Sequence, residues 1–174
     1  MRHPLRAALA ATLAAAAAFL AFGTGAAPAG ADVAPQADEA PPFAIEDFNY
    51  PQAAQIQAER GFLLKRGDGH IVLLAQCPAD TTDPDLLRIA ARGQPGTGYV
   101  CFNVSGNTGH LTLEMPSVYG VRTGNFDSEV VLTPDDGTTT KTYDVPPNTF
   151  AGVGESDPNG TGGEYMLLEI TVSR

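Results

Sequence analysis

Histidine is the side chain best suited to proton transfer near neutral pH, and two of the chain's three histidines lie well inside the sequence. His70 follows the turn-forming pair Asp68-Gly69, and His110 follows Gly106-Asn107. A hydrolase would need one of them beside a serine or cysteine nucleophile and an orienting acid, but the chain has no Gly-x-Ser-x-Gly motif. Because histidines at hairpin starts are usually exposed polar residues, the sequence predicts no catalytic residue, and a small secreted hydrolase stays an alternative.

Polar side chains alternate along one short segment, where His110, Thr112 and Glu114 are two residues apart. On a β-strand this spacing places them on one face, each about 7 Å from the next, which suits a metal or an acid/base pair. With His70 and Tyr99 they form the candidate surface site that the sequence predicts. The segment lacks a third strong metal ligand, so a solvated strand face is the favoured interpretation.

Another group of oxygen-bearing side chains, Asp157, Asn159 and Glu164, lies in a Gly-rich stretch. Loop carboxylates with Asn and Gly neighbours can bind calcium, but this stretch contains Pro158 and has too few ligand positions for an EF-hand loop. The sequence therefore favours plain turns over a calcium site, and it predicts no cofactor.

The first residues have the pattern of an export signal. A basic start precedes the apolar run from Ala7 to Phe22, and small residues then continue to Ala31. We expect residues 1–31 to be cleaved before Asp32, with a cut after Ala26 as the alternative. Glycines and Pro28 end the run short of the ~20 apolar residues that a membrane-spanning helix needs. The expected product has a flexible leader, residues 32–42, and a single secreted, extracellular domain, residues 43–174.

The charge of the expected mature chain limits its partners. Without Arg2 and Arg6 it keeps eight basic and twenty acidic residues, a formal charge of −12. Such a charge repels phosphate backbones and anionic lipids, so we expect neither nucleic acid nor a membrane surface as a partner.

Cys77 and Cys101 are the only two cysteines. In a chain bound for an oxidising compartment such a pair is usually a disulfide, and two thiols alone do not complete a zinc site. We therefore predict one disulfide between them.

The order of apolar and turn-forming residues predicts an all-β fold, an antiparallel β-sandwich or a barrel-like fold, with one short N-terminal helix that Asn49 or Tyr50 caps and Gly61 ends. The expected strands are Phe62–Arg66, His70–Gln76, Leu86–Ala91, Tyr99–Val104, His110–Met115, Glu129–Thr133, Thr138–Tyr143 and Tyr165–Val172.

Three of these strands carry further predictions. Tyr99–Val104 and His110–Met115 should pair as a hairpin across Gly106-Asn107, because both then turn their apolar residues to the core. Tyr165–Val172 should lie centrally in a sheet, and polar Thr138–Tyr143 should lie at an edge.

The segments Leu63–Ile71 and Leu111–Gly120 resemble small secreted proteins of high-GC Gram-positive bacteria, of the actinobacterial type, that carry no assigned activity. The resemblance implies export and a bacterial source over the chain from about Phe43 onward. Since these motifs consist of turns and strands, it implies no catalytic residue.

The expected function is a non-catalytic extracellular module that binds a protein or a cell-wall polymer. Besides the hydrolase, an inhibitor of extracellular proteases or a toxin-like effector is an alternative, with the exposed segment from Pro78 to Pro84 next to Cys77 as its binding loop.

Overall fold

The computed structural model describes residues 47–160 and 162–174 of the chain. The predicted signal segment 1–31, the leader 32–42 and the start of the domain at Phe43 lie outside the described residues.

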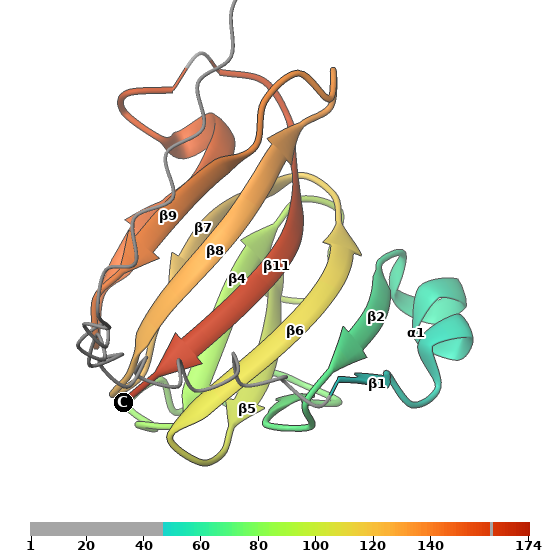
Figure 1. Ribbon diagram of the computed structural model, residues 1–174, viewed down its shortest axis with the longest axis vertical. Coiled ribbons are helices and arrows are strands. Elements are labelled where there is room, and N and C mark those ends of the chain that lie inside the picture. The colour runs from blue at the N-terminus through green and yellow to red at the C-terminus, as the bar shows by residue number, and fades with distance from the viewer. Residues whose placement is uncertain (1–46, 161) are drawn as a thin grey trace, which may run out of the picture. The chain divides into compact units, whose positions relative to one another are not determined.

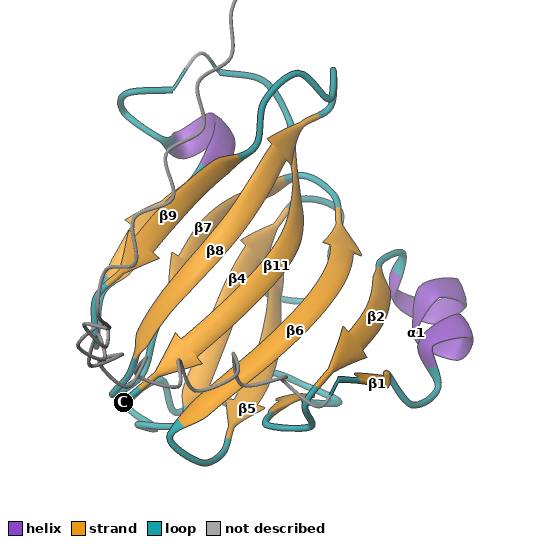
Figure 2. Cartoon of the chain, viewed as in Figure 1, coloured by secondary structure: helices purple, strands orange, loops and turns teal. Residues whose placement is uncertain are grey.

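The described chain is mostly β-strand, with one α-helix and one short 3₁₀ helix (Figure 2). Its elements in order are β1 Phe48–Asn49, α1 Ala53–Arg60, β2 Leu63–Gly67, β3 Ile71–Leu73, β4 Leu86–Ala91, β5 Tyr99–Val104, β6 Thr108–Met115, β7 Val118–Arg122, β8 Asp127–Pro134, β9 Lys141–Val145, β10 Phe150–Gly152, η1 Gly154–Ser156 and β11 Tyr165–Ser173.

The strands form two antiparallel sheets that pack face to face as a sandwich (Figure 1). The six-stranded sheet has the order β1-β2-β6-β11-β8-β9, and the five-stranded sheet has the order β10-β7-β4-β5-β3. Alternating residues fill the space between them, so that Leu87 and Phe102 of one sheet and Leu113 and Ile170 of the other are fully buried. The predicted all-β sandwich with one short helix is therefore confirmed.

Helix α1 packs beside β2 at the edge of the six-stranded sheet. It ends as predicted at Gly61, whose φ of 77° favours glycine and whose N–H donates to the Gln57 carbonyl. The predicted N-cap is wrong, because Gln52 precedes the first helical residue and Asn49 lies in β1. Tyr50 instead ties the two sheets together, since its hydroxyl accepts a hydrogen bond from the N–H of Leu73.

The predicted strand positions are largely confirmed. Strand β11 lies between β6 and β8 in the middle of its sheet, and β9 lies at the edge. The strand expected at His70–Gln76 is shorter and spans Ile71–Leu73, because the chain turns away from β5 after Leu74. Strands β1, β7 and β10 were not predicted, and each of them has at most five residues.

The predicted hairpin between Tyr99–Val104 and His110–Met115 is wrong. Strand β5 pairs with β3 and β4, while β6 pairs with β2 and β11 in the opposite sheet. The turn at Gly106-Asn107 therefore carries the chain from one sheet to the other. Both strands still turn their apolar residues to the core, and alternation alone does not distinguish a hairpin from such a crossing.

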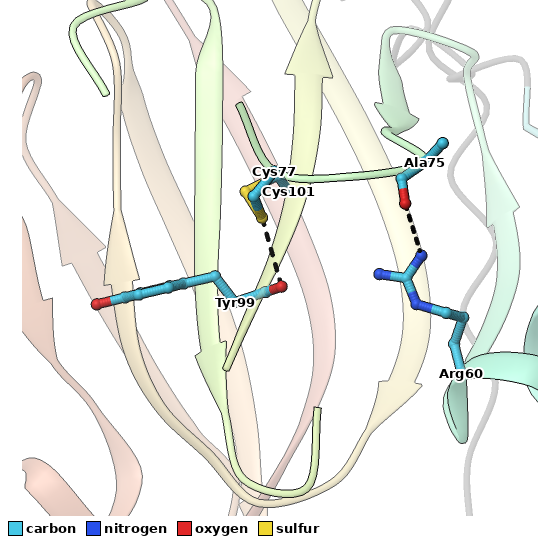
Figure 3. The surroundings of a disulfide bond; sticks show 5 residues. All are labelled: Arg60, Ala75, Cys77, Tyr99 and Cys101. Carbon is cyan, nitrogen blue, oxygen red and sulfur yellow. Dashed lines mark hydrogen bonds between the residues drawn. A yellow bond between two sulfur atoms is a disulfide. The ribbon is translucent and has the colours of Figure 1, made fainter. Parts of the chain in front are cut away.

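The predicted disulfide is present, and it joins Cys101 on β5 to Cys77 beyond β3, with 5.2 Å between their Cα atoms. The Leu74 N–H donates to the Cys101 carbonyl before the chain crosses the outer side of β5. Figure 3 shows this crossing segment, where Ala75 accepts a hydrogen bond from Arg60 and the ring of Tyr99 points away from the disulfide. The bond thus fastens an irregular segment to the outer face of the five-stranded sheet.

Candidate functional site

The structure divides the predicted surface site between the two sheets. His110, Thr112 and Glu114 lie on β6, on the outer face of the six-stranded sheet. Tyr99 lies on the outer face of the five-stranded sheet, on the other side of the sandwich, and His70 lies in the turn before β3. The five residues therefore do not meet at one place.

Residues of the neighbouring strand β2 contact two of the residues on β6. Thr112 Oγ1 accepts from the N–H of Arg66 and donates to its carbonyl, both at 3.2 Å, where the register between β2 and β6 shifts. Glu114 forms an ion pair with Lys65 at 2.5 Å. These contacts hold β2 against β6.

Asp68 connects the two histidines through the backbone. Its carboxylate accepts the N–H of His70 at 3.0 Å and the N–H of His110 at 2.9 Å. One of its oxygens also lies 3.3 Å from Nδ1 of the His70 ring. Ser105, the residue after β5, donates from its hydroxyl to the His70 carbonyl and not to the ring.

The surroundings of the His110 ring do not have the order of a hydrolase triad. Its Nδ1 lies 3.5 Å from Thr171 Oγ1 and 3.7 Å from Glu169 Oε1. A triad places the acid at one ring nitrogen and the nucleophile at the other, whereas here both approach the same nitrogen.

Of the three calcium candidates, Asp157 is occupied by protein groups. One of its carboxylate oxygens accepts the N–H of Asn159 at 2.8 Å, and the other accepts the Tyr143 hydroxyl at 3.1 Å. Glu164 contacts the chain through its carbonyl, which accepts the N–H of Asp135. Within residues 47–160 and 162–174, no three His, Cys, Asp or Glu side chains gather as metal ligands would.

The outer face of the five-stranded sheet holds a group of four residues, of which the sequence singled out only Tyr99. Arg88 on β4 lies directly opposite Arg122 on β7, and Phe150 on β10 lies opposite Arg122 on the other side. Tyr99 on β5 is next to Arg88, whose guanidinium carbon lies 4.2 Å from the centre of the Tyr99 ring. We call Arg88, Arg122, Tyr99 and Phe150 the arginine–aromatic face.

Arg88 and Arg122 lack the ion pairs that most other cations of the described chain have, as does Arg60. Five of the eight lysines and arginines in the described chain contact a carboxylate, namely Lys65, Arg66, Arg92, Lys141 and Arg174. Among the described residues no carboxylate lies within 4.0 Å of Arg88 or Arg122, and the buried Nε of Arg88 has no hydrogen-bond partner. Acidic residues outnumber basic ones two to one, 20 to 10, in the whole sequence, so a shortage of acids does not explain this.

Phe150 adds an exposed ring to the same face. It is 47% exposed and lies across Gly120, where a Cβ atom would come within 2.5 Å of its Cζ. Glycine at position 120 therefore leaves room for the Phe150 ring over β7.

Two concavities lie near the edge of the five-stranded sheet that β3 forms. One of about 410 Å³ lies beside the disulfide and is lined by Arg60, Cys77, Thr97 and Tyr99 among others. Another of about 360 Å³ lies between β1 and β3, where Phe48 is 62% exposed. The first extends the arginine–aromatic face past Tyr99.

Parts of the arginine–aromatic face left a signal in the sequence. Arg88 interrupts the apolar strand Leu86–Ala91, and a charge in such a strand must face outward or find a partner. Its position beside Arg122 depends on the pairing of β4 with β7, and β7 was not predicted.

No known family model matches this chain, and no curated protein matches its sequence significantly. Within the part of the chain that the structure describes, no helix is long and apolar enough to cross a membrane.

Proposed function

We propose that this protein is a secreted, non-catalytic module that binds an extracellular polymer or protein through the arginine–aromatic face. The observation that carries this function is the pair of arginines, Arg88 and Arg122, placed side by side with no carboxylate in reach among the described residues. Like charges directly opposite on neighbouring strands destabilise a sheet, so the stability of the fold does not explain why two arginines occupy these positions. Binding of an acidic group of a ligand would explain the pair.

The adjoining aromatic residues support the same role. Arginine, tyrosine and phenylalanine are enriched where proteins bind partners, because they offer a large contact area together with hydrogen-bond donors. Stacking on Tyr99 holds the Arg88 guanidinium in place before a ligand arrives, which lowers the entropy cost of binding.

The start of the sequence and the disulfide support secretion. Residues 1–31 have the order of a secretory signal, and disulfides persist mainly in oxidising compartments. Expression of the full chain should therefore release a protein into the medium whose first residue is Asp32, as N-terminal sequencing would show.

The binding role is tested with the protein recovered from the medium. It is incubated with insoluble cell-wall material and, separately, with immobilised culture-filtrate proteins, and its depletion from solution is measured. Wild type should be depleted by one of them, and Arg88→Gln/Arg122→Gln should lose at least about tenfold in affinity, because truncating charge-paired arginines has costs of that size.

The matched control is Lys65→Gln/Arg66→Gln, which removes the same charge from the other sheet. It should bind like wild type. No depletion by either material, or equal losses in both double variants, would refute the binding role of this face.

A further inference from the structure

The arginine–aromatic face has a geometry suited to one carboxylate. Directly opposite residues on antiparallel strands have Cα atoms about 4.5–5.5 Å apart, so the guanidinium groups of Arg88 and Arg122 can reach the same group. Arginine binds a carboxylate with two parallel hydrogen bonds, and two arginines can share its two oxygens.

The charge of the rest of the molecule argues against a dense polyanion. The chain without residues 1–31 has a formal charge of −12, and exposed Asp127, Glu129 and Asp144 line a groove of the opposite sheet. Charges beyond about 8 Å are largely screened at physiological salt, so a single carboxylate at the arginines feels little of this repulsion. A ligand with a charge on every unit would meet it along its whole length.

The distribution of apolar groups favours a ring-bearing polymer over a globular partner. Stable protein interfaces have an apolar core surrounded by a polar rim. Among residues 47–160 and 162–174, the exposed large apolar residues on the outer face of the five-stranded sheet are Phe150 and Val72. They lie on opposite edge strands, β10 and β3. Phe150 therefore offers one isolated ring, which suits stacking against a single sugar ring.

Resting on the proposed function, we infer that the ligand is a glycan of low charge density that carries spaced carboxylates. One carboxylate lies between Arg88 and Arg122, and a neighbouring sugar ring lies on Phe150. Tyr99 positions Arg88 and does not itself stack the ligand, because the guanidinium group covers its ring.

The probe is insoluble bacterial peptidoglycan, freed of phosphate-bearing polymers, in two forms. One form is native, and in the other the carboxylates are converted to neutral amides with a carbodiimide and ammonia. The secreted protein should bind native peptidoglycan and lose at least about tenfold in affinity for the amidated form, because the charge-assisted bonds are absent there.

Two further variants test the individual parts of the face. Phe150→Ala should weaken binding to both forms by a similar factor, because it removes the ring and leaves the arginines. Gly120→Ala should do the same by pushing the ring away, since the new Cβ would clash with it. Arg88→Gln/Arg122→Gln should bind native and amidated peptidoglycan equally weakly. A single cooperative urea-unfolding transition would show that each variant is folded.

The outcomes separate this inference from the proposed function. Equal binding to both peptidoglycan forms, or binding only to culture-filtrate proteins with loss in the arginine variant, would overturn the carboxylate glycan and keep a binding module. Polygalacturonate carries a carboxylate on every sugar unit. Tighter binding to soluble polygalacturonate than to peptidoglycan would overturn the proposal that the ligand has a low charge density. Binding to none of these materials would overturn both proposals.

Discussion

At the scale of single residues, the two arginines of the arginine–aromatic face should cost the free protein stability. Arg122 lies directly opposite Arg88, and like charges in such cross-strand positions repel. Arg122→Gln should therefore raise the free energy of unfolding by up to about 1 kcal/mol, as measured by urea denaturation. Arg92→Gln is the comparison, because it removes an arginine that is paired with Glu155, and it should not stabilise the protein. A clear loss of stability in Arg122→Gln would mean that this side chain has a structural partner.

Tyr143 should make stability depend on pH in the alkaline range. Its partly buried hydroxyl donates to Asp157 and accepts from the N–H of Gly154, and burial is the main cause that raises its pKa from 10.0 to about 12. Between these values the folded phenol keeps a proton that the unfolded phenol has lost, so stability falls as the pH rises from 10 to 12.

The measurement compares wild type with Tyr143→Phe, which has no titrating hydroxyl. The difference between their unfolding free energies should be largest below pH 10 and smaller near pH 12. A difference that stays constant over this range would show that the Tyr143 hydroxyl titrates normally.

At the scale of elements, β11 should be the strand on which the six-stranded sheet depends most. It lies between β6 and β8, and Ile170 is fully buried on its inner face. Ile170→Ala should lower the free energy of unfolding by about 2–5 kcal/mol, the usual cost of such a truncation in a core. Val131→Ala is the control, because Val131 lies half-buried on the neighbouring strand β8 and should cost clearly less. Similar losses of unfolding free energy in both variants would show that the buried side of β11 does not contribute more to stability than a half-buried position on β8.

The elements also show what the sequence could predict. Alternation located β4 and β5 to the residue and indicated that Val100, Phe102 and Leu113 face the core. It could not predict which strands pair, because residues on β5 and β6 point to the core whether the strands share a sheet or cross between sheets. Short strands such as β7 leave too few residues for a periodic pattern.

The candidate site was less predictable for the same reason. Tyr99 was expected on the same sheet face as His110, but the crossing between the sheets separates them. Pairing of β4 with β7 brings Arg88 next to Arg122 instead. Residues that meet across strands are neighbours only in the folded chain. The type of each residue was visible in the sequence, whereas its neighbours were not.

At the scale of the whole molecule, the disulfide should supply a large part of the stability. Cys77 and Cys101 are separated by 24 residues, and closing a loop of this size is worth about 3.5 kcal/mol in the chain-entropy model. Cys77→Ala/Cys101→Ala should lower the free energy of unfolding by about this amount in urea denaturation. Wild type treated with a reductant should approach the variant. Equal stability of oxidised wild type and the variant would contradict a stabilising disulfide.

The central place of β11 also affects the order in which a growing chain can fold. Strands β2 and β6 can form one ribbon and β8 and β9 another as they leave the ribosome, but only residues 165–173 join the two ribbons. A nascent chain that still lacks these residues leaves β6 and β8 with open edges. Completion of the six-stranded sheet must therefore wait until the last described strand has been synthesised.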